Sequence, residues 1–169
     1  IVGGAEAWRA APDLAAAHIA VVLDPEADLP QTFDALGARL DNAAILARAG
    51  VAIAFTVPGN SVYLSYDAGI ALREGAGIAV ANGLPYAQAL RAITAGAARI
   101  WGWGAGVGTL AVGADADVVI WDGDPLEPAS APLALFISGA PVPLATRQTE
   151  LRDRYSPSHA GDALPAGYR

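Results

Sequence analysis

The chain has 169 residues, of which 54% are hydrophobic, and this is enough for one domain of ordinary size with a substantial core. Its formal net charge is −7 and its 10 Lys and Arg residues are scattered, which excludes a nucleic-acid surface because phosphate binding needs clustered cations. Zero cysteines exclude disulfides and thiolate metal sites, and charged residues interrupt every apolar run before it could span a membrane.

The N-terminal third alternates strand-like and helix-like segments. Residues 19–23 form a short β-branched run that an Asp-Pro turn closes, as expected of a buried strand. Across residues 31–49 apolar side chains recur at helical spacing, which predicts an amphipathic helix. Gly50 stands where a left-handed helix cap belongs, and residues 51–55 restart a strand. This order of strand, helix and strand predicts a βαβ unit with a parallel sheet.

Two further helices are predicted after a loop. The Pro58-Gly59 dipeptide marks the loop, and residues 65–81 form a helix of small residues. Its glycines weaken the helix unless close packing against a neighbour offsets their cost. Pro85 fits the first position of a second helix that extends to residue 99.

The apolar period changes at Gly102 from that of a helix to that of a strand. Residues 109–112 and 118–121 are predicted strands, separated and followed by glycine and aspartate turn residues. We therefore divide the chain into three parts. These are an α/β part at residues 1–101, a β-rich part at residues 102–145, and a C-terminal part at residues 146–169 with a helix over 147–155 and a flexible tail.

Four segments carry a family resemblance, namely residues 83–102, 104–126, 135–142 and 147–155. They resemble the C-terminal part of metal-dependent hydrolases of the amidohydrolase superfamily, closest to its imidazolonepropionase-like, secreted bacterial branch. The resemblance implies an α/β fold, in which the C-terminal half of a (β/α)8 barrel is followed by strands of a small composite β-sandwich domain. It also implies a soluble, periplasmic or secreted protein with a small-molecule substrate, and zinc or another divalent metal in catalytically competent relatives.

The family's N-terminal features have no counterpart in this sequence. No segment resembles its first sandwich strands or its His-x-His barrel strand, and there is no signal peptide after Ile1. We therefore expect this chain to be the second half of a longer protein. Its partners would then be the missing N-terminal half and, as a homo-oligomer, further copies of itself.

In such barrels the active residues stand where the parallel strands end. The family would place a metal-ligating histidine near the end of the first strand here and a proton-accepting aspartate near the end of the last. Gly3 or Gly4 and Val57 occupy these positions. We therefore predict no metal ligand in this chain, and we expect the isolated chain to be inactive.

Five other residues are candidates for a site at the strand ends. Glu6 and Asp24 could share one mouth and divide the roles of acid and base. Their structural alternatives are an acid at a helix N-terminus and an Asx-type turn. Thr56, Asn60 and Ser61 follow the last barrel strand, where the family places substrate-contacting residues, although Asn is also a common turn residue.

The histidines and the C-terminal aspartates are interpreted as structural. His18 and His159 are too few for a histidine-rich metal centre. His18 precedes a strand at its amino end, and His159 lies in the tail, where exposure to solvent is expected. Four aspartates lack the distal glutamate of a calcium loop and are expected in hairpin turns. They are Asp115, Asp117, Asp122 and Asp124.

Three functions stay open at this point. The first is the C-terminal portion of an amidohydrolase-like hydrolase that acts on amide or cyclic amide bonds, which are non-peptide C–N bonds, with its catalytic metal ligands absent from this chain. The second is a metal-less, non-catalytic scaffold that acts as a binding or interaction protein. The third is an independent acidic binding module. The metal content of the full-length protein separates the first two, and an upstream His-x-His stretch would exclude the third.

Overall fold

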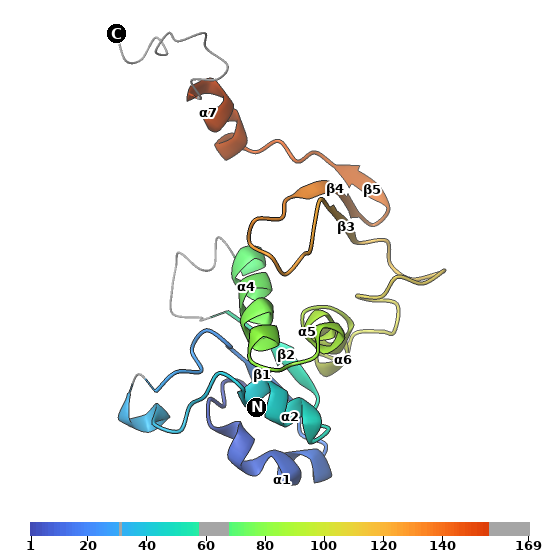
Figure 1. The fold of residues 1–169 in the computed structure, drawn as a ribbon. Coiled ribbons are helices and arrows are strands. Elements are labelled where there is room, and N and C mark those ends of the chain that lie inside the picture. Colours follow the sequence, from blue (N-terminus) through green and yellow to red (C-terminus); the bar gives the residue numbers. More distant parts are fainter. Residues whose placement is uncertain (31, 58–67, 156–169) are drawn as a thin grey trace.

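The computed structural model describes residues 1–30, 32–57 and 68–155 (Figure 1). Its α-helices are α1 (Ala11–Ala16), α2 (Asn42–Arg48), α4 (Ala68–Ala81), α5 (Tyr86–Ala92), α6 (Ala95–Ile100) and α7 (Arg147–Tyr155). Its strands are β1 (Val21–Leu23), β2 (Ile53–Phe55), β3 (Val118–Trp121), β4 (Pro132–Ile137) and β5 (Ala140–Val142). Short 3-10 helices lie at η1 (Ala7–Ala10) and η2 (Phe33–Ala35).

A small parallel sheet lies at the centre of the N-terminal part. β1 pairs with β2 in parallel, with Val22 opposite Ala54, and Val2 forms a parallel bridge to Val22 on the other side of β1. All three side chains of each strand are buried, as expected of a parallel sheet covered on both faces. The predicted parallel pairing is therefore confirmed, and the described residues contain no closed barrel. That this sheet is half of a barrel stays a prediction.

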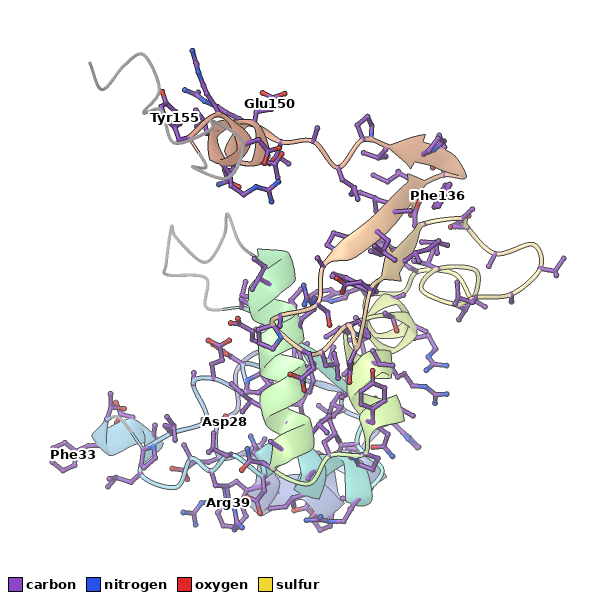
Figure 2. The ribbon with its side chains drawn as sticks, turned by 45° about the horizontal axis from the view of Figure 1, so that its top comes forward. Asp28, Phe33, Arg39, Phe136, Glu150 and Tyr155 are labelled. Carbon is purple, nitrogen blue, oxygen red and sulfur yellow. The ribbon has the colours of Figure 1, made fainter. Side chains whose placement is uncertain are left out.

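The predicted helix over residues 31–49 is wrong in its extent. Only α2 is α-helical, and Phe33 before it is 91% exposed and points away from the body of the molecule (Figure 2). Tertiary hydrogen bonds hold the preceding segment in a non-helical conformation at Gly37. The Gly37 N–H donates to Glu6 over 2.7 Å, and the Gly37 carbonyl accepts from Trp8 Nε1 over 2.8 Å. At the other end, α2 stops as predicted, because Gly50 adopts a φ of +87°.

The predicted helix from residue 85 to 99 is two helices. Pro85 has an extended ψ of 134° and precedes α5 instead of occupying its first position. The chain then breaks at Thr94, whose φ of −131° and ψ of −114° are not helical, and α6 begins at the next residue. The second helix returns so closely that a Cβ on Gly96 would lie 2.5 Å from the Arg91 carbonyl oxygen. Only glycine permits this approach.

Two of the three glycines of α4 stand at close contacts, as the sequence predicts, whereas a Cβ on Gly69 would meet nothing within 4 Å. A Cβ on Gly75 would lie 3.3 Å from Pro25 Cδ, and one on Gly77 would lie 3.1 Å from the carbonyl oxygen of Leu126. Helix α4 therefore packs directly on the segment after β1 and on the loop after β3. The first three residues of the predicted helix, 65–67, lie outside the described residues.

A second, antiparallel sheet forms the β-rich part in the order β3-β4-β5. The predicted strand at 118–121 is confirmed as β3, but the predicted strand at 109–112 is wrong. That segment is folded by turn bonds such as Asp115 N–H to the Gly106 carbonyl at 3.1 Å, and it loops away from the sheet (Figure 1). Leu110 is 87% exposed as a result.

Arg73 and Tyr86 connect the two parts of the fold. Arg73 on α4 donates to the carbonyls of Pro125, Glu127 and Ser130, and its guanidinium lies 4.2 Å from the centre of the Trp121 ring. The Tyr86 hydroxyl on α5 donates to Asp124 over 2.6 Å. These contacts tie the loop after β3 to the helices that cover the parallel sheet. The predicted C-terminal helix is present as α7, whereas the composite sandwich and the domain boundaries stay predictions.

Candidate functional site

The carboxyl ends of the parallel strands meet along one edge of the small sheet. The Thr56 N–H donates to the Leu23 carbonyl over 2.8 Å, and the Gly3 N–H donates to the Val22 carbonyl over 2.9 Å. The segments that follow Val2, β1 and β2 therefore leave the sheet side by side. In parallel α/β folds this edge is where ligands bind. We call the four polar residues Asp24, Glu26, Asp28 and Thr56 the strand-end cluster.

The turn after β1 determines how Asp24 is held. Its Oδ1 accepts the backbone N–H of Glu26 over 3.2 Å, which is the Asx-type turn that was the structural alternative for this residue. Asp24 is half-buried and keeps its second oxygen for other contacts. Thr56, directly across the sheet edge, is also half-buried and donates its hydroxyl to the Val57 carbonyl over 3.3 Å. Whether either residue contacts substrate stays a prediction.

Glu6 leaves the strand ends and binds elsewhere. Its Oε1 accepts the Gly37 N–H and its Oε2 accepts the Arg9 guanidinium, each over 2.7 Å. Both carboxylate oxygens are thus occupied, one by the segment before α2 and the other by η1. In the described residues no hydrogen bond joins the side chains of Glu6 and Asp24. Glu6 has a structural task that the sequence pattern did not reveal.

A buried carboxylate, Asp28, lies four residues beyond Asp24 and was not among the sequence candidates. It is 3% exposed, and its Oδ2 accepts the side-chain amide of fully buried Asn42 over 3.2 Å. Burial raises the pKa of Asp28 to about 6, an effect that the Asn42 hydrogen bond opposes and the Asp24 carboxylate reinforces. A carboxyl with a pKa of about 6 can exchange a proton near neutral pH.

Glu26 faces a hollow beside the cluster. Burial raises its pKa, and the nearby carboxylates of Asp24 and Glu74 raise it further. Its Oε1 is buried and accepts no hydrogen bond from the described residues. The hollow has a volume of about 800 Å³. Its wall combines three carboxylates with apolar side chains, namely Glu26, Glu74 and Glu127 with Leu29, Leu40, Ile78 and Leu126.

The described residues do not fit a metal centre by themselves. The two strand-end positions at which the family would place ligands hold Gly3 or Gly4 and Val57, and none of these has a side-chain donor atom. Among the described residues, no group of three His, Cys, Asp or Glu side chains could hold a metal ion. No chemical step can therefore be assigned to a metal held by these residues.

The remaining predicted residues lie away from this edge or outside the description. Asn60, Ser61 and His159 fall outside the described residues. His18 lies in the turn before β1, at the amino end of the strand, with a φ of +54°. Three of the four C-terminal aspartates accept backbone N–H groups, as expected of turn residues. These bonds join Asp117 to Ser138, Asp122 to Ala131 and Asp124 to Leu126.

Helices long and apolar enough to cross a bilayer are absent from the part of the chain that the structure describes.

The comparisons with known proteins agree on one family. The amidohydrolase family matches residues 11–146. Amidohydrolase tasK of Hapsidospora irregularis is 44% identical over 57 residues, which are 34% of this chain and 6% of that protein. The crystal structure of an amidohydrolase from Thermotoga maritima MSB8 superposes with a TM-score of 0.72 and 26% identity, over 84% of this chain and 36% of that one.

A second solved structure, of an uncharacterized protein, shares the fold. It superposes with a TM-score of 0.59 and 24% identity, over 80% of this chain and 37% of its own length. The chain therefore spans 36% and 37% of the lengths of these two solved structures.

Proposed function

Because this chain belongs to the amidohydrolase family, we propose that it forms the C-terminal portion of a hydrolase that cleaves amide or cyclic amide bonds, which are non-peptide C–N bonds. The observation that carries the proposal is the likeness to the Thermotoga maritima amidohydrolase over 84% of this chain. The matched region contains the parallel strands and the polar residues at their carboxyl ends. In parallel α/β enzymes catalytic residues stand at this end.

The strand-end cluster and its hollow suit a small substrate that is partly polar. Apolar side chains such as Leu29 and Ile78 would cover the carbon skeleton, and the carboxylates of Glu26 and Glu74 would accept N–H groups of an amide. Burial raises the pKa of Glu26, so this carboxyl binds a proton more readily than an exposed glutamate, and its protonated form can donate to a carbonyl oxygen. Asp24 and Thr56 would orient the substrate at the sheet edge.

Metal chemistry would come from outside the described residues. A divalent metal, if residues elsewhere in the whole protein held one, would supply Lewis-acid activation of a water molecule. This chain has glycine and valine at the two strand ends where the family would place ligands, so in our proposal the ligands lie elsewhere in the whole protein. The chain itself supplies the substrate wall, and we propose a soluble, periplasmic or secreted location.

The test uses the complete protein that the gene encodes, including any sequence beyond these 169 residues. It is assayed against open-chain amides, cyclic amides and lactones, with and without added zinc. We expect turnover of at least one amide or cyclic amide. Asp24→Asn and Thr56→Val should reduce kcat/KM, whereas Asp13→Asn on the exposed face of α1 should not.

Two results would overturn the proposal. One is the absence of any hydrolysis by the complete, metal-analysed protein, which would favour the non-catalytic scaffold. The other is hydrolysis that Asp24→Asn, Thr56→Val and the control variant leave equally unchanged, because the strand-end cluster would then lie outside the site.

A further inference from the structure

A second hollow lies at the opposite end of the parallel strands. It has a volume of about 660 Å³ and is formed by the residues before β1, the end of α2, the start of β2, and helices α5 and α6. Because the strands run parallel, their amino ends face away from the strand-end cluster. We call this depression the amino-end hollow. It shares no lining residue with the hollow beside Glu26.

The charge of the amino-end hollow is opposite to that of the whole chain. Its lining includes His18, Arg91 and Arg99 together with the amide side chain of Gln88, and it contains no Asp or Glu. The chain as a whole has 17 acidic residues against 10 basic ones. A wall that gathers two arginines and a histidine without any carboxylate is therefore unlike the rest of this surface.

The guanidinium groups of the hollow are not used by the rest of the described residues. Across residues 1–30, 32–57 and 68–155, neither Arg91 nor Arg99 forms an ion pair, and neither side chain forms a hydrogen bond. Other arginines are engaged, as Arg9 binds Glu6 and Arg73 binds three carbonyls. Two exposed guanidinium groups thus line the same depression with donors that the described residues do not use, and an anion with several oxygens could accept them.

The backbone of α5 and α6 brings the two arginines to one wall. Each lies in the last turn of its helix, and the tight return at Gly96 places the second helix directly against the carbonyl of Arg91. Arginine is favoured at helix C-termini because of the helix dipole, which is the simplest explanation for either residue alone. Arg48 follows the same preference at the end of α2, but it does not line the hollow. The helix dipole can explain why an arginine ends each helix, but it does not explain why the lining of the hollow contains no carboxylate.

The third donor side chain of the hollow, that of His18, is held by an uncommon backbone. His18 has a φ of +54°, a left-handed conformation that few non-glycine residues adopt. The turn bonds of His18 N–H to the Ala15 carbonyl and Ile19 N–H to the Leu14 carbonyl fix this conformation. The imidazole ring lines the hollow, where it can donate a hydrogen bond to an oxyanion.

We propose that the amino-end hollow is a binding site for a small oxyanion, a molecule that carries a carboxylate or phosphate group. Arg91 and Arg99 bind the anionic oxygens, and His18 and Gln88 complete the donor set. The site is separate from the proposed hydrolytic edge, so it would bind a ligand other than the hydrolysed substrate.

Binding is tested with the whole chain at constant ionic strength, with sodium chloride as the balancing salt. Inorganic phosphate and succinate are titrated separately and followed by amide NMR and calorimetry, so that the two sources of an oxyanion are distinguished. We expect saturable shifts at Gln88, Gly96 and the His18 ring with at least one of the two ions. The doubly substituted R91Q/R99Q chain should bind about tenfold more weakly or worse, because two charge-assisted contacts are lost.

The matched control is R147Q/R152Q on α7, which changes the net charge equally at the far end of the molecule (Figure 1). It should alter the affinity by less than about twofold, because exposed charges at that distance are screened. His18→Gly is a second variant that suits the φ of +54°, and it should weaken binding without loss of thermal stability. The proposal is overturned if neither ion saturates, if R91Q/R99Q binds as well as R147Q/R152Q, or if the shifts lie outside the hollow.

Discussion

The side-chain amide of Asn42 joins the buried carboxylate of Asp28, 3.2 Å away, to the backbone carbonyl of Gly4, 3.0 Å away. On its other side, the Asn42 carbonyl oxygen accepts the N–H of Trp8 over 3.0 Å. One fully buried side chain therefore connects the segment after Val2 with the segment after β1. The geometry of two strand ends depends on this residue.

The first prediction is that Asn42→Ala destabilises the fold strongly. The substitution leaves the buried carboxylate of Asp28 and the partly buried backbone groups of Gly4 and Trp8 without their partner, and an unsatisfied buried group costs about 1–3 kcal/mol. We expect a loss of about 3–5 kcal/mol in the free energy of unfolding, measured by urea denaturation. Asn82→Ala is the control, because among the described residues the Asn82 side chain bonds only to the Ile78 carbonyl, four residues before it. Equal losses in the two variants would contradict the role of Asn42.

The second prediction is that Asp28 lowers stability as pH rises. Its pKa of about 6 in the folded chain lies above the ordinary value of 3.8, so between these values the folded state binds more protons than the unfolded state. The free energy of unfolding must therefore fall with increasing pH across this window. The contribution is fully present below pH 3.8 and lost above about pH 6, and it is on the order of 2–3 kcal/mol.

The measurement compares unfolding free energies at pH 4.5 and pH 7.5 in the parent chain and in Asp28→Asn. Asparagine keeps an oxygen that accepts the Asn42 amide but does not titrate in this range. We expect the variant to lose less stability than the parent between the two pH values. Asp13→Asn, an exposed control on α1, should keep the parental difference. If Asp28→Asn loses as much stability between the two pH values as the parent chain does, then the Asp28 carboxyl titrates normally.

Local signals explain why the strands were predictable. Residues 21–23 and 53–55 are buried apolar runs next to turn residues, and their parallel pairing follows from the helix between them. The segment before α2 was not predictable in this way. Its apolar spacing is helical, but Gly37 is held by Glu6 and Trp8, which lie 31 and 29 residues away in the sequence. No local pattern reports such distant bonds.

The candidate site was only partly predictable from the sequence, again because some of its contacts join residues far apart in the chain. Asp24 and Thr56 follow strands directly, so their place at the sheet edge could be inferred from chain order. The importance of Asp28 comes from its burial beside Asn42, which depends on tertiary packing. A polar Asn42 among the apolar positions of a helix was the one available signal, because a polar residue on a core face needs a partner. The strand prediction for residues 109–112 failed for a different reason, since a strand-like pattern forms a strand only where another strand pairs with it.

The third prediction compares two glycines of α4. A Cβ on Gly77 would lie 3.1 Å from the Leu126 carbonyl oxygen, whereas one on Gly69 would meet nothing within 4 Å. Gly77→Ala should therefore destabilise the chain by about 1–3 kcal/mol through a backbone clash. Gly69→Ala should be neutral or stabilise it by up to ~1 kcal/mol, because alanine favours helix. Thermal unfolding distinguishes the two, and a stabilising Gly77→Ala would contradict the packing of α4 on the loop after β3.

The fourth prediction concerns the connection that Arg73 makes to the loop after β3. Arg73→Leu removes donors from the carbonyls of Pro125, Glu127 and Ser130 together with the stacking on Trp121. We expect a loss of about 2 kcal/mol in stability. Backbone amides of residues 126–131 should also exchange with solvent faster. Arg73→Lys should recover only part of the protection, since lysine has the charge but not the planar set of donors. Unchanged exchange in Arg73→Leu would mean that this loop is held by other contacts.

The last prediction is that residues 1–169, expressed alone, self-associate. β2 pairs with β1 on one side, and no other described strand pairs with its second edge. Large apolar side chains are also exposed in the segment between α6 and β3, with Leu110 at 87% and Trp103 at 64%. Unpaired strand edges and exposed apolar groups recruit other chains. Size-exclusion chromatography with light scattering should therefore detect species larger than the monomer.

A double substitution locates the surface responsible for this association. Leu110→Ser combined with Val112→Ser removes exposed apolar side chains from a segment outside both sheets, so it should shift the population toward monomer without reducing thermal stability. Leu151→Ser, at a 40% exposed position of α7, is the control and should leave the association unchanged. If the parent chain is monomeric and unfolds in one sharp transition, its core closes without a partner, and the expectation of a missing half loses its support.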